Sequence, residues 1–364
     1  MNKKGKVTKQ RWVRMSILVI IIVLIKIFST NTQLVETIYA TKFYRGISWF
    51  LRIIFGWMPF SIGDLLYLLV IIWLIGKVWK FSAKLYRRKL NKKWFVNAGF
   101  TWVFIGAFIY IIFNIFWGIN YNRKQVSELL NLKLVKPDTA DLIIIEKLLL
   151  QKVNLSKQSL IDKHATYPDN KDLFVRAANC YVQAEKKYRF LSYKPASVKR
   201  SMFGLFGNYV GFTGYYNPFT GEAQLNTMVP KFILPYTTTH EIAHQLGYAK
   251  EEEANFVGYL AATTSTDTLF HYSTYLDLFV YANRQLFFTD SVAAKNLANQ
   301  LLPEVKADIK EWKEFLRKHK NPLEPVIRWA YGNYLKANQQ PNGMTSYDEV
   351  IADLIAFYKK YGRI

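Results

Sequence analysis

The sequence predicts a membrane protein with three N-terminal transmembrane helices followed by a mainly helical α+β domain. The first reason is composition. Of the 364 residues, 51% are hydrophobic and 16% aromatic, and the formal charge is +23, a combination that is unusual in soluble enzymes and ordinary in membrane proteins. The second reason is order along the chain, because the long apolar segments come first and helical periodicity with short β-prone runs follows.

Three segments have the length and the apolar character of transmembrane helices. They cover residues 12–28, 62–79 and 95–117, which is close to the length needed to cross a bilayer. The first segment carries Arg14 and Lys26 near its ends, where long basic side chains can extend to the interface. No small-x-small cleavage site follows it, so we expect an uncleaved span rather than a signal peptide.

An aromatic segment at residues 47–58 lies between the first two predicted spans. It is too short to cross a bilayer, it contains Arg52, and Pro59 follows it. These features are typical of a helix that lies in the membrane interface. We therefore assign residues 1–117 to a membrane domain whose partner is the lipid bilayer.

The basic residues predict which side of the membrane each segment faces. Residues 1–14 carry six Lys or Arg and no acidic residue, and residues 77–93 carry eight and none. Because Lys and Arg are enriched in cytoplasmic segments, both stretches are predicted to be cytoplasmic and residues 118–364 extracytoplasmic. The excess charge thus follows membrane topology, which argues against a nucleic acid as the partner.

Residues 118–364 are long enough to form one domain with a substantial core. Helical periodicity covers residues 138–164 and 172–191, and two β-prone runs around turn residues predict a hairpin at 210–227. An exposed edge strand of that hairpin could pair with an extended peptide, and a purely structural hairpin is the alternative. The single cysteine, Cys180, excludes an intrachain disulfide and is expected to be buried. Further helices are predicted at 273–288, 291–316, 325–337 and 346–361.

A His-Glu-x-x-His motif carries the candidate chemistry. His240 and His244 are four residues apart, which places both imidazoles on one helix face, one turn apart, as two ligands of one zinc ion require. Glu241 is rotated away from that face. It can therefore act as a general base toward a zinc-activated water without binding the metal itself.

The helix that carries this motif has a predicted start and stop. Pro235 is expected to break the preceding segment, and the three threonines at 237–239 offer N-capping hydroxyls. Gly247 is a natural residue for the left-handed turn that ends a helix. We therefore predict a helix over residues 237–246.

A zinc site of this type needs a third protein ligand. The next predicted helix begins with Glu251, Glu252 and Glu253. Glu251 is the first choice, because it shares a helix face with Asn255, which could orient a metal ligand, and Glu253 is the alternative. A solvated first turn, favoured by the helix dipole, would also explain three glutamates.

Three other residues are weaker candidates for the same site. His271 or Tyr272 could donate a hydrogen bond to an oxyanion formed at the metal. Tyr272 fits equally well as part of the apolar face of its helix. Glu222 could brace a metal-bound histidine.

Several separated motifs resemble a bacterial membrane family called domain of unknown function 3810, in the same order along the chain. The resemblance covers nearly the whole chain and implies a presumed zinc metallopeptidase of the bacterial cytoplasmic (inner) membrane, with His240, Glu241, His244 and the run Glu251–Asn255 in its site. The motifs are WGINYNR (117–123), GYYNPFTGEAQLN (214–226), PYTTTHEIAHQLGYAKEEEANF (235–256) and HYSTYL (271–276).

Two further comparisons concern the third ligand. The Glu-x-x-Ala-Asn order resembles runs in other glutamate-type zinc peptidases, in which the first Glu is the ligand, and this implies Glu251. In those peptidases the third ligand usually lies farther along the chain from the second histidine. The segment also resembles the metzincin pattern HExxHxxGxxH as far as Gly247, but Lys250 stands where that pattern has its third histidine, and a protonated Lys cannot bind a metal.

Together these observations predict three transmembrane helices and a zincin-like metallopeptidase domain at 118–364, mainly helical and of α+β class. The predicted reaction is hydrolysis of peptide bonds in a peptide or protein substrate, with Zn²⁺ as cofactor and Glu241 as general base. The alternative is a non-catalytic, zinc-stapled binding or scaffold domain. An intact Glu241 favours the enzyme, because a structural site needs no base.

Overall fold

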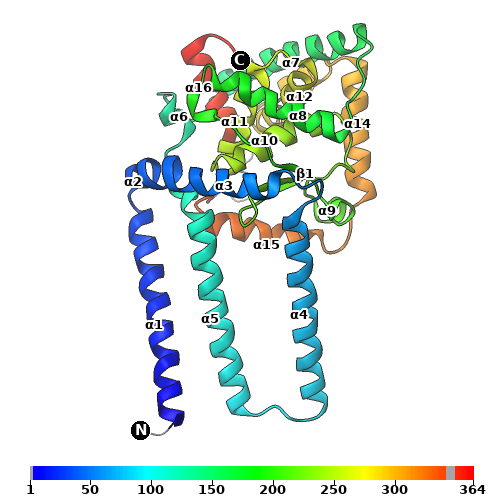
Figure 1. Cartoon of the computed structure of the whole chain (residues 1–364). Helices are drawn as coiled ribbons and strands as arrows, with labels where there is room; N and C mark the ends of the chain where they lie inside the picture. Colours follow the sequence, from blue (N-terminus) through cyan, green and yellow to red (C-terminus); the bar gives the residue numbers. More distant parts are fainter. Residues whose placement is uncertain (1–2, 342–348) are drawn as a thin grey trace. The chain divides into compact units, whose positions relative to one another are not determined.

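The computed structural model describes residues 3–341 and 349–364, and it is mainly helical with one small sheet. The chain divides into two compact units (Figure 1). Unit 1 comprises Met1–Ile47 and Ile62–Arg123, and unit 2 comprises Ser48–Ser61 and Lys124–Ile364. The segment Ser48–Ser61 therefore groups with the C-terminal part, although it lies between two long apolar helices in the sequence.

Unit 1 contains three helices that are long and apolar enough to cross a membrane. The three predicted spans are confirmed as apolar helices, and this indicates association with a membrane. The second of them continues to Tyr86, beyond the predicted end at residue 79, because the basic residues that follow are good helix formers. The helices are α1 (Lys3–Ser29), α4 (Ile62–Tyr86) and α5 (Lys92–Phe116).

Helix α5 contacts the other two helices through polar and aromatic side chains. Arg11 on α1 donates from Nη1 to Oδ1 of Asn97 on α5 over 2.9 Å. Trp73 on α4 meets Trp102 on α5 edge-on, with ring centroids 5.8 Å apart. Helix α5 therefore contacts both α1 and α4.

Short helical segments flank these helices in unit 1. Arg123 donates to the carboxylate of Glu36 over 2.9 Å, and both side chains are about nine-tenths buried. The Tyr39 hydroxyl donates to the backbone carbonyl of Asn114 over 3.1 Å. No helix or strand was predicted for residues 30–44, most of which form a π-helix. The segments are α2 (Thr32–Leu34), the π-helix η1 (Val35–Tyr44) and the 3-10 helix η2 (Gly118–Asn122).

The segment predicted at 47–58 forms α3 (Arg45–Gly56), which joins unit 2 from Ser48 onward. Ser48 donates from Oγ to the carbonyl oxygen of Gln245 over 2.8 Å. The guanidinium of Arg52 lies over the ring of Tyr193, 4.9 Å from its centroid. These contacts attach α3 to the end of the helix that carries the histidines.

Unit 2 contains a three-stranded sheet in the order β1-β3-β2. The predicted hairpin is confirmed, because β2 (Gly214–Asn217) pairs antiparallel with β3 (Glu222–Leu225), with Gly214 opposite Leu225. Strand β1 (Val198–Arg200) pairs parallel with β3 and was not predicted, because three residues are too few to show an alternating pattern. Among the described residues β2 therefore forms one edge of the sheet.

Helices form most of the hydrophobic core of unit 2, and the sheet contributes Val198, Ala223 and Leu225 to it. The two helices predicted at 138–164 and 172–191 are present, and each is capped by an aspartate, Asp138 and Asp169, whose side chain accepts a backbone N–H of the first turn. Cys180 is buried, as predicted. The helices of this part are α6 (Val126–Leu129), α7 (Thr139–Asp162), α8 (Asn170–Glu185), the 3-10 helix η3 (Arg189–Leu191), α9 (Gly204–Val210), α10 (Leu234–Gln245), α11 (Glu251–Thr264) and α12 (Thr268–Thr289).

The C-terminal helices differ from the prediction at one place. The single helix expected at 291–316 is wrong, because the chain turns after residue 298 and Pro303 starts a new helix at a position where no backbone N–H is needed. Part of the helix predicted at 346–361 lies outside the described residues. The helices are α13 (Ser291–Ala298), α14 (Pro303–Lys318), α15 (Glu324–Ala337) and α16 (Val350–Tyr361).

Candidate metal centre

Helix α10 carries both histidines and starts earlier than the sequence predicted. It begins at Leu234, so Pro235 lies within the first turn, where its missing N–H costs nothing. The predicted capping role of the threonines at 237–239 is therefore wrong. Their hydroxyls donate instead to carbonyl oxygens three or four residues earlier in the same helix. The predicted stop is confirmed, because Gly247 adopts a φ of 88° directly after the helix.

Helices α10 and α11 pack closely beside the histidines. A Cβ atom added to Gly258 would lie 3.2 Å from the backbone N of His240 and 3.3 Å from the ring of Tyr236. The Tyr236 hydroxyl donates to the carbonyl oxygen of Asn255 over 2.9 Å. A residue without a side chain at Gly258 thus lets the middle of α11 approach the backbone of α10 at His240.

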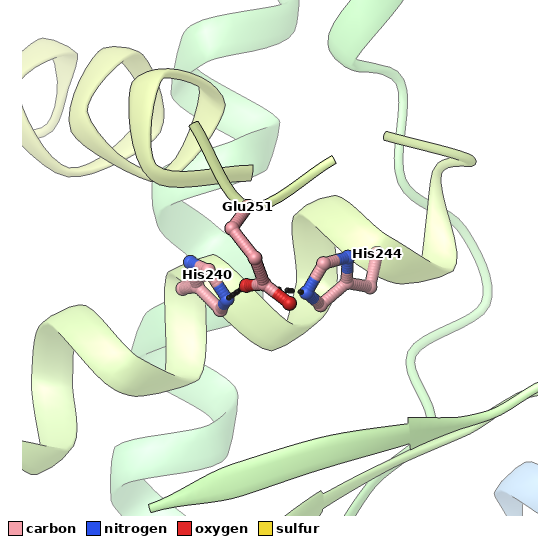
Figure 2. A group of neighbouring side chains, drawn as sticks. All are labelled: His240, His244 and Glu251. Atoms are coloured by element: carbon pink, nitrogen blue, oxygen red, sulfur yellow. Dashed lines mark ion pairs between the residues drawn. The ribbon is translucent and has the colours of Figure 1, made fainter. Parts of the chain in front are cut away.

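The side chains of His240, His244 and Glu251 converge on one point (Figure 2). Their possible ligand atoms all lie within 4.8 Å of one another. Oε2 of Glu251 is 3.3 Å from Nε2 of His240 and 3.6 Å from Nε2 of His244. Two imidazole nitrogens and one carboxylate oxygen at this spacing could hold a metal ion.

The other nitrogen of each imidazole has a fixed partner. Nδ1 of His240 lies 2.8 Å from Oδ1 of Asn255, and Nδ1 of His244 lies 2.7 Å from the carbonyl oxygen of Tyr248. Because both partners are acceptors, both Nδ1 atoms carry the proton. The Nε2 lone pairs then face the Glu251 carboxylate, and a cation or proton is needed between them.

The pKa shifts at these residues also indicate that positive charge is needed between the imidazoles and the Glu251 carboxylate. Burial alone would raise the pKa of Glu251, but its hydrogen bonds to the two histidines hold that pKa well below its usual value. Burial alone would lower the pKa of His244, but the contact with Glu251, the charges of Glu251 and Glu241 and the Tyr248 carbonyl together outweigh burial and raise that pKa to about 9. The carboxylate therefore stays ionised and attracts positive charge, which a metal ion can supply in place of protons.

Two residues from the C-terminal part also contact Glu251. The Tyr331 hydroxyl on α15 donates to Oε1 of Glu251 over 3.0 Å, and the backbone N–H of Glu251 donates to Oε1 of Gln340 over the same distance. Oε2 of Glu251 is buried and lies 3.3 Å and 3.6 Å from the Nε2 atoms of the two histidines. One carboxylate oxygen is thus held by Tyr331, and the other is directed at the histidines.

Glu241 is buried beside the metal-ligand face, next to the start of β2. A Cβ atom added to Gly214 would lie only 2.5 Å from Oε1 of Glu241. Oε2 of Glu241 has no hydrogen-bond partner among the described residues. Burial raises the pKa of Glu241 to about 7, with His240 and His244 acting in the opposite direction. A carboxyl with these properties is suited to accept a proton near neutral pH.

Neither of the two glutamates that follow Glu251 belongs to the group formed by His240, His244 and Glu251. Oε2 of Glu253 accepts the backbone N–H of Val126, over 2.6 Å, at the start of α6. Burial raises the pKa of Glu252 to about 8. Of the three candidates for the third ligand, Glu251 is the one that the fold brings to the histidines, and Glu253 caps another helix.

The weaker candidates lie away from this group. Nε2 of His271 contacts the carbonyl oxygen of Ser265, and the Tyr272 hydroxyl donates to Asp308. Glu222 accepts hydrogen bonds from Ser61 and Thr220, while the histidine Nδ1 atoms have other partners.

Three contacts of the site were not predicted. Tyr331 and Gln340 are about 80 to 90 residues from Glu251 in the sequence, and such distances leave no local signal. The third contact is the one between His244 and the carbonyl oxygen of Tyr248. The position of that carbonyl depends on the turn at Gly247, which the sequence did indicate.

The fold and the site define a membrane-associated, mainly helical protein with a side-chain group able to hold a metal ion. The chain belongs to the family described as "Protein of unknown function (DUF3810)", whose model matches residues 39–355. This confirms the family resemblance seen in the motifs, and the peptidase activity stays a prediction. No curated protein and no solved structure matches the chain in the same comparisons.

Proposed function

We propose that the protein is a membrane-anchored, zinc-dependent metallopeptidase that hydrolyses peptide bonds. One observation carries the proposal: His240, His244 and Glu251 present three ligand atoms to one point, with the buried carboxylate of Glu241 beside them. A structural site needs the three ligands but no carboxylate of this kind, whereas hydrolysis needs a proton acceptor.

The ligand set supports zinc as the metal. Two imidazole nitrogens and one carboxylate oxygen are a common donor set of catalytic zinc, which keeps a further position for water or substrate. Both imidazoles have an acceptor on Nδ1, as zinc-binding histidines usually do. When bound, zinc would polarise the scissile carbonyl and lower the pKa of a water molecule.

Strand β2 supports an extended peptide as the substrate. It lies at an edge of the described sheet, and three of its four residues are partly exposed. A peptide paired with that edge would gain backbone hydrogen bonds. Gly214 at the start of β2 touches Glu241, so a peptide on this strand would pass close to the proton acceptor.

Glu241 has a separate task in the reaction. It takes a proton from the attacking water, whose oxygen bonds to the carbonyl carbon. As the C–N bond breaks, Glu241 can return that proton to the leaving amine. Oε2 of Glu241 has no competing hydrogen bond among the described residues, which leaves it available for this transfer.

The apolar helices and the basic segments support a proposal for the location. We propose a multi-pass protein of the bacterial cytoplasmic membrane, with residues 118–364 on the extracytoplasmic side. Three apolar helices of spanning length support the membrane. The basic residues at 1–14 and 77–93 support the side.

The proposed activity is tested by incubating the zinc-loaded, full-length protein in detergent with a degenerate peptide library and identifying products by mass spectrometry. We expect cleavage that stops on chelation, returns with zinc and is absent from His240→Ala. Cleavage products that still form with the His240→Ala preparation would come from a contaminating peptidase. An absence of wild-type cleavage for the library and for extracts of envelope proteins would contradict the proposal.

A further inference from the structure

Helix α3 carries its apolar side chains on the outside of unit 2. Its inner face presents polar side chains to the domain, Ser48 to Gln245 and Arg52 to Tyr193. From Ser48 onward its exposed positions are all apolar, which is the reverse of a helix on a water-soluble domain. The exposed residues of this face are Trp49, Phe50, Ile53, Ile54 and Trp57.

A second exposed apolar surface lies on α9 and at the start of α15. The two helices are in contact, because Nδ2 of Asn321, just before α15, donates to the carbonyl oxygen of Tyr209 on α9 over 2.6 Å. Trp329 is 71% exposed and Leu205 is 59% exposed. The exposed residues of this surface are Leu205, Phe206, Leu323, Val326 and Trp329.

Strand β1 connects the two surfaces. Nζ of Lys199 donates to the carbonyl oxygen of Gly56, the last residue of α3, over 2.6 Å. Helix α9 begins at Gly204, shortly after β1 ends at Arg200. Figure 1 shows α3, α9 and α15 along the same side of unit 2, away from α7. We call the exposed apolar faces of these three helices the docking surface.

Covalent connection limits what can cover the docking surface. Helix α4, one of the three apolar helices of spanning length, begins at Ile62, directly after the unit 2 segment ends at Ser61. The five residues between Gly56 and Ile62 reach at most roughly 20 Å. The end of α3 therefore stays within that distance of the end of an apolar helix that is long enough to cross a membrane.

Charge around the docking surface favours the same occupant. Arg200, Lys320 and Lys336 are exposed and lie within seven residues of the docking surface in the sequence. Arg328 is also exposed, although it pairs with Glu324. Exposed Trp side chains beside basic residues are the usual composition of a surface that enters the boundary between head groups and acyl chains of anionic lipids.

We propose that unit 2 lies on the lipid bilayer through the docking surface, with the apolar faces of α3, α9 and α15 entering the head-group boundary. The inference goes beyond an interfacial α3, because it assigns α9 and α15 to the same contact. It does not depend on the chemistry at the metal centre, so the two proposals can fail separately.

The test places a fluorescent label on each part of the docking surface of the full-length protein. Cys180, the single cysteine, is replaced by Ser, and Ile53→Cys, Leu205→Cys or Trp329→Cys is labelled with an environment-sensitive dye. The matched control is Leu155→Cys on α7, because Leu155 is 60% exposed and Leu205 59%. Each protein is reconstituted into phosphatidylcholine–phosphatidylglycerol vesicles after its zinc content has been checked against wild type.

Quenching by acyl-chain spin-labelled lipid is compared with quenching by aqueous iodide. We expect lipid to quench the labels at 53, 205 and 329 at least about 3-fold more than the label at 155, with iodide showing the reverse order. Lipid quenching at 53 alone, with iodide reaching 205 and 329, would overturn the proposal. Shielding of 205 and 329 from both quenchers would also overturn it, because a protein surface would then cover them.

Discussion

Oδ1 of Asn255 lies 2.8 Å from Nδ1 of His240, so a residue in the second turn of α11 fixes the orientation of a metal-ligand candidate on α10. We expect Asn255→Ala to lower zinc affinity about 10- to 100-fold, because the imidazole loses the acceptor that directs its Nε2 toward Glu251. Chelator competition on the purified protein measures this. Asn255→Asp keeps an acceptor oxygen and should bind zinc nearly as wild type does. Unchanged affinity in Asn255→Ala would show that the contact does not orient the ligand.

Glu251 and Glu253 are two residues apart, and their carboxylates have different partners in the structure. We expect Glu251→Ala to empty the site as strongly as His240→Ala, because a direct ligand is lost. Glu253→Ala should keep zinc but lower stability by about 1–3 kcal/mol, because the buried N–H of Val126 loses its acceptor. Metal analysis and thermal unfolding of the variants check both points. An empty site in Glu253→Ala and a full one in Glu251→Ala would reverse the assignment.

Local sequence signals predicted the parts of the site that lie within one or two turns of helix. The spacing of His240 and His244, and the positive φ of Gly247, both depend on neighbours in the chain. The start of α10 was placed too late, since Pro235 was taken as a breaker when it occupies the first turn. Threonines can cap a helix or donate to its own carbonyls, and only the surrounding packing decides between these.

Contacts between distant segments could not be predicted in the same way. Tyr331 reaches Glu251 from another helix, and nothing in its own segment marks it as part of the site. Strand β1 is too short to show alternation, and its pairing depends on β3. The polar inner face of α3 is also a tertiary feature, because Arg52 is buried against Tyr193 rather than exposed.

Glu146 on α7 predicts a pH dependence of stability that is unrelated to the metal. It is fully buried, and Nδ2 of Asn283 donates to its Oε1 over 2.5 Å. Burial raises its pKa from 4.5 to about 7, although the hydrogen bond from Asn283 acts in the opposite direction. Between these pH values the unfolded chain releases the proton while the folded protein keeps it, so the stability that the group contributes falls as pH rises through this window.

Glu146→Gln removes this titration and keeps an acceptor for Asn283. We expect the variant to gain up to about 3 kcal/mol over wild type at pH 8, with the difference shrinking as pH falls toward 4.5. Denaturant unfolding of the detergent-purified protein at several pH values measures the difference. A difference that does not change with pH would mean that Glu146 keeps its ordinary pKa.

The side of the membrane that unit 2 faces can be tested with reporter fusions. We expect a reporter that is active only in the cytoplasm to be active when fused after Lys89, in the basic segment between α4 and α5, and silent when fused after Arg123. The reason is the concentration of Lys and Arg at 77–93. Activity of the second fusion would place residues 118–364 in the cytoplasm.

The different roles of the ligands and of Glu241 give the most direct test of a peptidase. Glu241→Gln preserves size and shape but removes the proton acceptor, while His240, His244 and Glu251 keep their ligand atoms. The measurement is the rate of peptide cleavage by Glu241→Gln and wild type, at equal zinc content and with matching thermal unfolding. We predict a loss of at least about 100-fold, the lower end of what a positioned general base contributes. Cleavage at the wild-type rate would contradict the account and leave the histidine–glutamate group as a structural staple.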